Sequence, residues 1–333
     1  MNDASVARAE ARPLLSVVAP FYNEELVVER FFPAIIDVLQ ATGLAWEIVC
    51  VDDGSSDQTL EYLLAAAKTR PPVKVLRLSR NFGKEAALTA GMEASAGDVV
   101  ILLDADLQDP PELITRMLEK WREGFDVVYG VRQSRDSDSL GKRITAGAFY
   151  RVFNQLTPTP VPVNTGDFRL MDRRVVDRVR QLPERTRFMK GLFAWVGFKS
   201  TAIAYDRPGR AAGQSAWSYW KLWNFALDGL TSFSTMPLRV WTYVGLTVSL
   251  LSFLYASFLV FRTLVAGVDL PGYASLMVVI LFLGGIQLIS LGVIGEYLGR
   301  VFIEVKQRPV YLVDRVYQFG PEGEPGPADD PAA

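Results

Sequence analysis

Two aspartates that follow a short apolar stretch are the residues best placed to do chemistry. Residues 99–103 are apolar, and Asp104, Asp106 and Gln108 come directly after them. Alternate residues of an extended chain point the same way, so both carboxylates can face one ion. Carboxylate and phosphate oxygens suit Mg²⁺ or Mn²⁺, and such a metal neutralises charge on a diphosphate leaving group. The alternative is a turn at the end of a strand, with Asp109 capping the next helix.

Polar motifs follow two other apolar stretches. Asp53 can accept hydrogen bonds from a base or a ribose, although the Asp-Gly pair that it begins is equally common in plain turns. Pro20, Tyr22 and Glu24 offer a stacking ring and a carboxylate at the end of the first apolar stretch. The alternative there is that Asn23 caps a helix. Both motifs are therefore candidate ligand contacts.

Two further polar clusters lie later in the chain. Asp167 follows a glycine and precedes Arg169 by two residues, so it could act as a base or hold an acceptor. A turn with a local ion pair explains the same spacing equally well. Arg207 and Arg210 lie in a glycine-containing segment, which suits phosphate binding near a membrane surface. Attraction to anionic lipid headgroups is the alternative for these two arginines.

The composition excludes several kinds of active site. The 333 residues include no histidine and a single cysteine, Cys50, which excludes Ser-His-Asp triads, Cys-His pairs, His-ligated metals and intrachain disulfides. Neither a G-x-G-x-x-G nor a G-x-x-x-x-G-K-[ST] motif occurs, so dinucleotide and P-loop chemistry is unsupported. The net charge of −2 provides no overall basic field, and we expect no nucleic-acid partner. Acid-base and metal chemistry must rest on carboxylates.

Alternating strand and helix patterns must position these side chains. Short apolar runs predict strands, and apolar residues at helical spacing predict the helices between them. The predicted strands are 14–20, 46–51, 73–78, 99–103 and 126–129, and the predicted helices are 24–40, 57–68, 84–94 and 110–123. This alternation predicts an α/β domain with a mostly parallel sheet, whose ligands bind beyond the carboxyl ends of the strands.

Hydrophobic residues, 50% of the chain, concentrate towards the C-terminus. Residues 240–261 and 270–295 carry no charge, and at about 1.5 Å per residue either run can cross a hydrocarbon core of about 30 Å. Tryptophan and tyrosine before the first run are typical of a belt at the headgroup level. Lysine and arginine flank the outer ends of the pair, which predicts that both termini are cytoplasmic. Two buried helices of a soluble core are the alternative.

These patterns divide the chain into five parts. The N-terminal segment is polar and lacks the apolar core of a signal peptide. We expect a disordered N-terminus over 1–13, a cytoplasmic catalytic domain over 14–215, interfacial aromatic helices over 216–239, two transmembrane helices over 240–300, and a cytoplasmic tail over 301–333 that is disordered after 320.

Together, the motifs resemble those of the family 2 glycosyltransferases that load sugars onto polyprenyl phosphates, a group that includes the bactoprenol glucosyltransferases and dolichyl-phosphate mannose synthase. The segments that carry the resemblance are 18–25, 51–57, 80–84, 104–112, 166–173 and 294–300. The resemblance covers nearly the whole chain, to about residue 315. It implies a glycosyltransferase A-type α/β domain followed by a two-helix transmembrane hairpin in the bacterial inner membrane.

The resemblance also implies a role for each motif. It assigns the nucleotide to Pro20, Tyr22, Glu24, Asp53 and Asp104, the metal (Mg²⁺ or Mn²⁺) to Asp104, Asp106 and Gln108, the phosphates to Arg132, Arg207 and Arg210, and catalysis to Asp167 as the base together with Asp106. Relatives usually carry a lysine where Ala216 stands, which leaves one phosphate contact of the family open in this chain, with Lys221 as the candidate to supply it.

The expected reaction is the inverting transfer of a hexose, with UDP-glucose as the first candidate donor, to undecaprenyl phosphate on the cytoplasmic face of the membrane. UDP-formamido-arabinose, GDP-mannose and an N-acetylhexosamine nucleotide stay open as donors. A non-catalytic membrane scaffold that retains the fold is the alternative from another class, and the intact Asp104, Asp106 and Asp167 disfavour it. The expected partners are the nucleotide sugar, the lipid acceptor, membrane lipid and further copies of the chain, with a tetramer as the candidate homo-oligomer.

Overall fold

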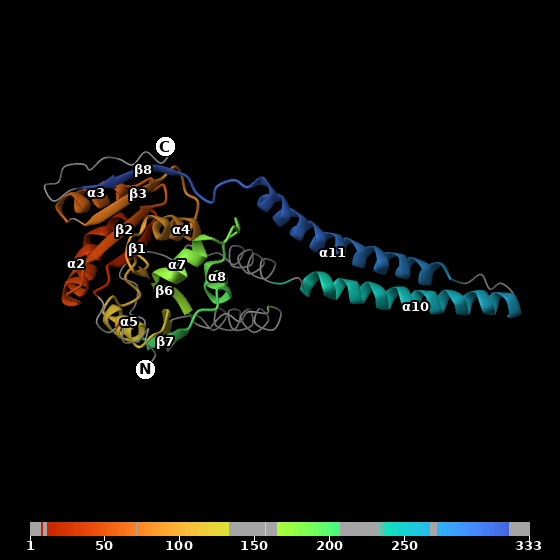
Figure 1. Cartoon of the computed structure of the whole chain (residues 1–333). Helices are drawn as coiled ribbons and strands as arrows, with labels where there is room; N and C mark the ends of the chain where they lie inside the picture. The colour runs from red at the N-terminus through yellow and green to blue at the C-terminus, as the bar shows by residue number, and fades with distance from the viewer. Residues whose placement is uncertain are drawn as a thin grey trace.

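The computed structural model of this chain describes residues 8, 12–70, 72–132, 157, 165–206, 234, 236–266 and 272–319. Arg207, Arg210 and Ala216 lie outside the described residues, as does nearly all of the predicted aromatic segment 216–239. Figure 1 shows that a sheet with helices on both sides forms one end of the molecule and that a long helical hairpin projects from it.

An eight-stranded sheet runs in the order β7-β5-β6-β4-β1-β2-β3-β8. Neighbours among β1 to β4 pair in parallel, β7 pairs in parallel with β5, and β6 and β8 run antiparallel to their neighbours. The strands are β1 (Leu15–Phe21), β2 (Trp46–Asp52), β3 (Val73–Leu78), β4 (Val99–Leu102), β5 (Val127–Arg132), β6 (Thr165–Asp172), β7 (Ser200–Tyr205) and β8 (Val313–Gln318). The mostly parallel α/β sheet predicted from the sequence is thus confirmed.

Helices cover both faces of this sheet because strand side chains alternate between the two faces. On one face, Phe31 of α2, Leu63 of α3 and Met117 of α5 are buried in one core cluster. On the other face, Leu88 of α4 and Val176 of α7 belong to a second cluster, to which α8 also contributes. The helices are α2 (Glu25–Ala41), α3 (Thr59–Thr69), α4 (Lys84–Ala94), α5 (Leu113–Arg122), α7 (Arg173–Arg180) and α8 (Met189–Trp195).

Local patterns locate most of these elements. β3 and α4 have the predicted bounds, and the other predicted strands and helices end within a few residues of their predicted limits. The patterns do not predict β6, β7 or β8. β8 lies in the predicted tail 301–333 and pairs with β3, which is distant in the sequence, so a local pattern could not reveal it. This strand covers a sheet edge that would otherwise expose unpaired backbone groups.

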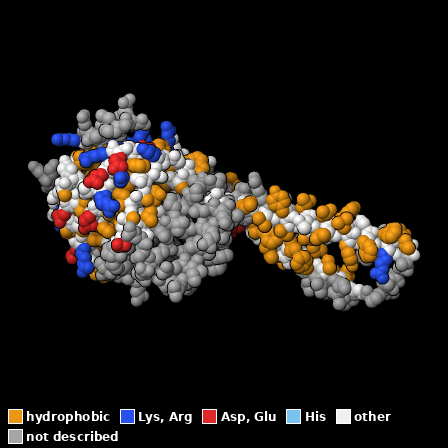
Figure 2. All heavy atoms as spheres, turned by 90° about the horizontal axis from the view of Figure 1, so that it is seen from below, with side chains coloured by type: hydrophobic (Ala, Val, Ile, Leu, Met, Phe, Trp, Pro, Cys, Tyr) orange, Lys and Arg blue, Asp and Glu red, His pale blue; other side chains and the backbone are white. Residues whose placement is uncertain are grey.

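Two long helices form the projecting hairpin. They are α10 (Met236–Ala266) and α11 (Tyr273–Lys306), and Figure 2 shows hydrophobic side chains over much of their surface. One stretch in the described residues, Phe282–Lys306, is long and apolar enough to cross a membrane, with a mean hydropathy of 1.4, whereas the apolar stretch in α10, Tyr243–Tyr255, is shorter. The sequence predicts two spans over 240–300, and α10 itself has 31 residues, about 46 Å of helix.

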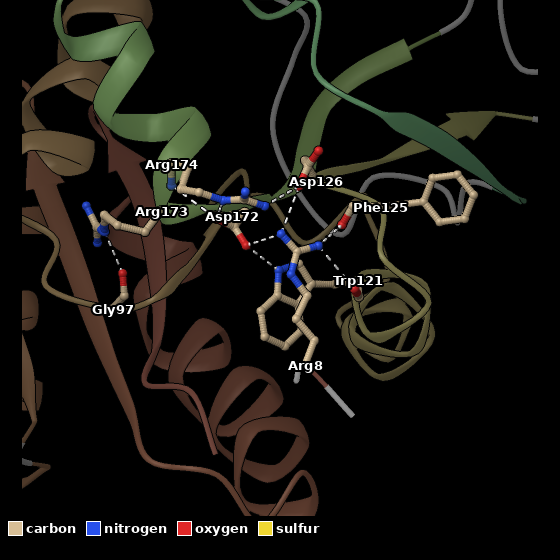
Figure 3. A network of polar contacts seen from close by, with 8 residues as sticks. All are labelled: Arg8, Gly97, Trp121, Phe125, Asp126, Asp172, Arg173 and Arg174. Carbon is tan, nitrogen blue, oxygen red and sulfur yellow. Dashed lines mark hydrogen bonds and ion pairs between the residues drawn. The ribbon is translucent and has the colours of Figure 1, made fainter. Parts of the chain in front are cut away.

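A network of buried charges closes the sheet on the side where the parallel strands begin. Arg8 places Nη2 2.8 Å from Asp126 Oδ1 and 2.6 Å from Asp172 Oδ2, and its guanidinium lies over the ring of Trp121 (Figure 3). Asp172 also accepts hydrogen bonds from Trp121 Nε1 and Arg174 Nε. We call Arg8, Trp121, Asp126, Asp172 and Arg174 the Arg8 network. Arg8 lies within the segment 1–13 for which the sequence predicts disorder.

Candidate active site

The loops after β1 and β2 meet at the carboxyl edge of the sheet and hold each other. The backbone N–H of Asn23 donates to Ser55 Oγ at 3.0 Å, and Asn23 Oδ1 accepts from the backbone N–H of Ser56 at 2.9 Å. Asn23 thus bonds across to the neighbouring loop and does not cap α2, which begins without a side-chain cap. Tyr22, beside it, is 47% exposed and open to a ligand, while the backbone N–H of Glu24 donates to Thr59 Oγ1.

Asp53 joins this edge to the loop that precedes α4. Its two carboxylate oxygens accept hydrogen bonds from the backbone N–H groups of Phe82 (2.7 Å) and Gly83 (2.9 Å). Gly54 adopts a φ of +67°, and a Cβ there would lie 2.5 Å from the carbonyl carbon of Arg80, so the two loops can touch only at a glycine. Burial raises the pKa of the Asp53 carboxyl, and the two N–H groups counteract part of that effect.

A lysine lies between carboxylates from two strands. Lys84, at the start of α4, places Nζ 2.7 Å from Asp104 Oδ1 and 2.5 Å from Asp167 Oδ2. Asp104 follows β4, and Asp167 lies in the neighbouring antiparallel β6. The side chains of Lys84, Asp104 and Asp167 are 39%, 23% and 12% exposed, so solvent reaches the group from one side. We call these three residues the Lys84 cluster.

The two carboxylates of the Lys84 cluster differ in their electrostatics. Burial raises the pKa of Asp104, and Lys84 lowers it only in part. Burial also opposes ionisation of Asp167, but Lys84 and Lys190 outweigh it and hold the pKa of Asp167 well below the usual range. Asp167 is therefore ionised at neutral pH and a poor proton acceptor. The adjacent Glu85 behaves in the opposite way, because burial raises its pKa to about 8.

Several polar atoms around the Lys84 cluster are buried without a hydrogen-bond partner in the structure. They are Asp104 Oδ1, Asp167 Oδ1, Glu85 Oε2, Asp109 Oδ2 and Gln108 Nε2. Asp104 Oδ1 lies near Lys84 Nζ, but the hydrogen bond from that ammonium goes to Oδ2 at 2.9 Å. Buried polar atoms without partners are costly, and such atoms gathered in one place indicate a binding site for a polar ligand.

The predicted metal ligands Asp104, Asp106 and Gln108 form a turn at the end of β4. Asp106 Oδ1 accepts from the backbone N–H of Gln108 at 3.2 Å, and Leu107 between them has a φ of +53°. Within the described residues, no group of three or more Asp, Glu, Cys or His side chains has a metal-binding arrangement. Mg²⁺ commonly takes one or two protein carboxylates and completes its shell with phosphates and water. The carboxylates of Asp104 and Asp106, two residues apart in one turn, fit that requirement.

A second charged group lies beside this turn. Tyr205, the last residue of β7, donates its hydroxyl to Asp109 Oδ1, and Arg132 at the end of β5 lies 3.8 Å from the same carboxylate. Burial and Asp109 raise the pKa of Tyr205 to about 12. Asp109 therefore binds Tyr205 and does not cap α5, which also begins without a side-chain cap. A Cβ at Gly166 would lie 3.3 Å from Arg132 Nη2, so the glycine leaves room for the guanidinium.

The structure thus brings most of the sequence-predicted residues to one edge. Sequence reasoning assigned no role to Lys84 or Tyr205, and gave Asp109 only the role of a helix cap. Lys84 follows β3, and the rule that parallel strands end at a common edge was the available signal for it. Tyr205 gave no such signal, because β7 was not predicted.

Comparisons with known proteins identify relatives of this chain. Residues 16–180 match the model of glycosyl transferase family 2, and residues 236–301 match the GtrB C-terminal hairpin. An uncharacterized glycosyltransferase of Synechocystis sp. is 58% identical, with 91% of this chain and 95% of that protein covered. The SfII prophage-derived bactoprenol glucosyl transferase of Shigella flexneri is 47% identical, with 92% and 99% covered.

Solved structures show a more distant likeness. Glucosyl-3-phosphoglycerate synthase from Mycobacterium tuberculosis, in complex with Mn²⁺, uridine diphosphate and glucosyl-3-phosphoglycerate, is 17% identical, with a TM-score of 0.45. The match covers 69% of this chain and 81% of that one. A likeness of this extent gives no information on the ligands of the present chain.

Proposed function

This chain belongs to glycosyltransferase family 2 and carries the GtrB-type C-terminal hairpin, and from this premise we propose that it transfers a hexose from a nucleotide sugar to undecaprenyl phosphate. The observation that carries the proposal is the Lys84 cluster, which gathers charged and unpaired polar atoms at the ligand-binding edge of the sheet. UDP-glucose is the proposed donor. The similarity to the Shigella bactoprenol glucosyl transferase supports glucose as the sugar.

The hairpin supports a lipid acceptor. Along α10 and α11 large apolar side chains are exposed, among them Phe253, Phe258, Leu288 and Phe302. A soluble protein rarely exposes an apolar surface of this extent. We propose that both helices enter the bacterial inner membrane, with the catalytic domain and both termini in the cytoplasm. Arg207 and Arg210 would then hold the acceptor phosphate near the membrane surface.

The donor would lie across the carboxyl edge. Tyr22, exposed at the end of β1, is available to contact a base, beside Pro20 and Glu24. Asp53 supports this site through the loop before α4, because both its oxygens bind backbone N–H groups. Asp104, Asp106 and Gln108 would hold Mg²⁺ or Mn²⁺. When bound, the metal supplies positive charge that stabilises the departing diphosphate.

The chemistry requires little help from a base. A phosphate oxygen of the acceptor attacks the anomeric carbon of the sugar, the bond from that carbon to the diphosphate breaks, and the configuration inverts. A phosphate monoester has a second pKa of about 6, so the nucleophile is already largely ionised at neutral pH. The low pKa of Asp167 and its pairing with Lys84 fit a residue that orients the acceptor and does not remove a proton. Arg132 would contact a phosphate beside Asp109.

The test is a direct transfer assay. Purified full-length protein in neutral detergent is incubated with undecaprenyl phosphate and, separately, with UDP-glucose, UDP-formamido-arabinose, GDP-mannose or UDP-N-acetylglucosamine, each with Mg²⁺, Mn²⁺ or EDTA. We expect a lipid-phosphate hexose, detected by mass, with UDP-glucose and a metal. A product formed only with another donor would identify that donor as the substrate in place of UDP-glucose, and the proposed class of reaction would stand. No product with any donor, together with no nucleotide binding by calorimetry, would favour the scaffold.

A further inference from the structure

A polar cavity lies where the hairpin joins the domain, and no residue of the Lys84 cluster lines it. It has a volume of about 410 Å³ and is lined by the end of α7, the loop 181–187 and the segment 309–311 that follows α11. Three arginines line it, Arg180, Arg185 and Arg187, against one acidic side chain, Glu93. Among the residues that line the cavity, three positive charges therefore stand against one negative charge. Behind the lining, Glu184 acts electrostatically on Arg187, and Glu304 binds the backbone of Arg185.

The loop that bears two of these arginines is held from both sides. Arg187 Nη2 donates to the carbonyl of Leu182 at 2.9 Å, and Arg187 Nε donates to the carbonyl of Glu184 at 3.2 Å, so the loop folds around this guanidinium. Glu304, in the last turns of α11, accepts from the backbone N–H of Arg185 at 2.9 Å. The hairpin thus fixes one wall of the cavity.

One of the three guanidinium groups has no partner among the described residues, and a second has only an exposed one. Glu93, the acidic residue of the cavity, already accepts a hydrogen bond from the Tyr311 hydroxyl at 2.5 Å. The guanidinium of Arg185 has no partner among the described residues. Arg180 has only Asp177 within ion-pair distance in the described part of the chain, at 3.8 Å, and both side chains are more than two-fifths exposed. An exposed pair of this kind is weak.

We propose that this cavity binds a phosphate group, and that its natural source is the headgroup of an anionic membrane lipid. The planar guanidinium matches phosphate oxygens in two-point hydrogen bonds, and the volume lies in the range of small-ligand sites. The adjoining end of α11 exposes Val301, Phe302 and Val305, so a lipid beside that helix would have its headgroup near the cavity. None of the residues proposed for sugar transfer lines it.

The experiment compares arginine variants in nanodiscs. Full-length protein is placed in phosphatidylcholine nanodiscs with or without phosphatidylglycerol, and its Tm is measured with and without inorganic phosphate. Arg185→Gln removes the free guanidinium, Arg185→Lys keeps its charge, and Arg116→Gln on α5 removes an exposed arginine outside the cavity. Each variant is also titrated with inorganic phosphate in neutral detergent by calorimetry.

We expect phosphatidylglycerol to raise the Tm of the wild type and of Arg116→Gln, but not of Arg185→Gln. Phosphate should bind about tenfold more weakly to Arg185→Gln, because a charge-assisted pair is lost, and Arg185→Lys should lie between. If inorganic phosphate stabilises the wild type but phosphatidylglycerol does not, and Arg185→Gln abolishes this effect, the site stands and its ligand is a free phosphate compound. No stabilisation by either, or full binding in Arg185→Gln, would overturn the proposal. Asp104→Asn should bind phosphate as tightly as the wild type does. A failure of the transfer proposal would therefore leave the result of this test unchanged.

Discussion

The Lys84 cluster and the Arg8 network contain the same types of residue but serve different purposes. Each places two aspartates around a basic side chain at an edge of the same sheet. In the Arg8 network both oxygens of Asp172 accept hydrogen bonds, and no carboxylate oxygen is buried without a partner (Figure 3). In the Lys84 cluster, Asp167 Oδ1 is buried without a partner, and Asp104 Oδ1 is buried with only the Lys84 ammonium beside it, 2.7 Å away.

The difference separates a structural ion pair from a candidate active site. A group with all its hydrogen bonds made gains nothing from a ligand, whereas unpaired buried atoms gain a partner when a polar ligand arrives. The pKa values of the aspartates in the two regions also differ, in a direction that agrees with their hydrogen bonds. Burial opposes ionisation of Asp172, but Trp121, Arg174 and Arg8 outweigh it and lower its pKa. Burial raises the pKa of Asp104, because Lys84 compensates only in part. We therefore expect substitutions in the two regions to affect different measurements.

The largest effect should come from Asp104→Asn. Loss of this carboxylate removes a proposed metal ligand, and we expect turnover to fall by about a hundredfold to a thousandfold or more, the usual cost of removing one group that stabilises developing charge. The free energy of unfolding should not fall, because the substitution removes a carboxylate whose ionised form is poorly solvated. Transfer is measured by product mass, with Asp37→Asn on α2, where the residue is exposed, as the matched control. Metal-dependent turnover near the wild-type rate would remove Asp104 from the site.

Asp172→Asn should show the reverse pattern. Asp172 forms a buried pair with Arg8, and removing one partner of such a pair typically costs about 3 kcal/mol of the free energy of unfolding. Its pair with Arg174, whose side chain is 63% exposed, adds little. The rate of transfer at a temperature where the variant is folded should match that of the wild type. Chemical denaturation in detergent gives the stability. A loss of turnover without a loss of stability would make the Arg8 network part of the active site.

These expectations rest on residues that the sequence revealed to different degrees. Asp104 and Asp106 could be predicted because an apolar run marks the strand before them and parallel strands end at one edge. Asp167 was a candidate only from its place between a glycine and Arg169 and from the resemblance to the family, since β6 was not predicted. The role of Lys84 could not be predicted. A lysine at the start of a helix is usually solvated, and its two partners are revealed only when the strands that carry them are positioned in the fold. For Asp53, the sequence left a ligand contact and a plain turn equally possible. Its two hydrogen bonds reach a loop that no local pattern connects to it.

The elements of the fold also differ in how far the sequence could predict them. β3 and α4 were predicted to the residue because their apolar periodicity is local. β8 was missed because its partner β3 is distant in the sequence, and nothing near 313–318 indicates that partner. The Arg8 network was missed for the same reason. Arg8 lies in a polar segment, and only the folded chain brings it to Asp126 and Asp172.

Lys84→Met should have an intermediate effect. Without the ammonium, Asp104 and Asp167 lose the charge that holds them together, and we expect kcat/KM to fall by about tenfold to a hundredfold, in line with the loss of a hydrogen bond between charged groups. Lys84→Arg should recover part of the loss. Lys120→Met on α5 is the control, because its pair with Glu123 is exposed. Unchanged kcat/KM in Lys84→Met would show that the lysine only fills space.

The smallest effect concerns how stability depends on pH, and the two regions should differ in sign. The pKa of Asp172 is lower in the folded chain than in the unfolded one, so its contribution is present above about pH 4 and is lost as the pH falls through the folded value. Glu85 beside the Lys84 cluster has a folded pKa of about 8, so stability falls as the pH rises from about 4 towards 8. Asp172→Asn should flatten the acid limb of a Tm-against-pH curve, and Glu85→Gln should flatten the limb between pH 4 and 8. If Glu85→Gln leaves that limb unchanged, Glu85 is ionised in the folded protein, and the contrast between the two regions does not extend to this residue.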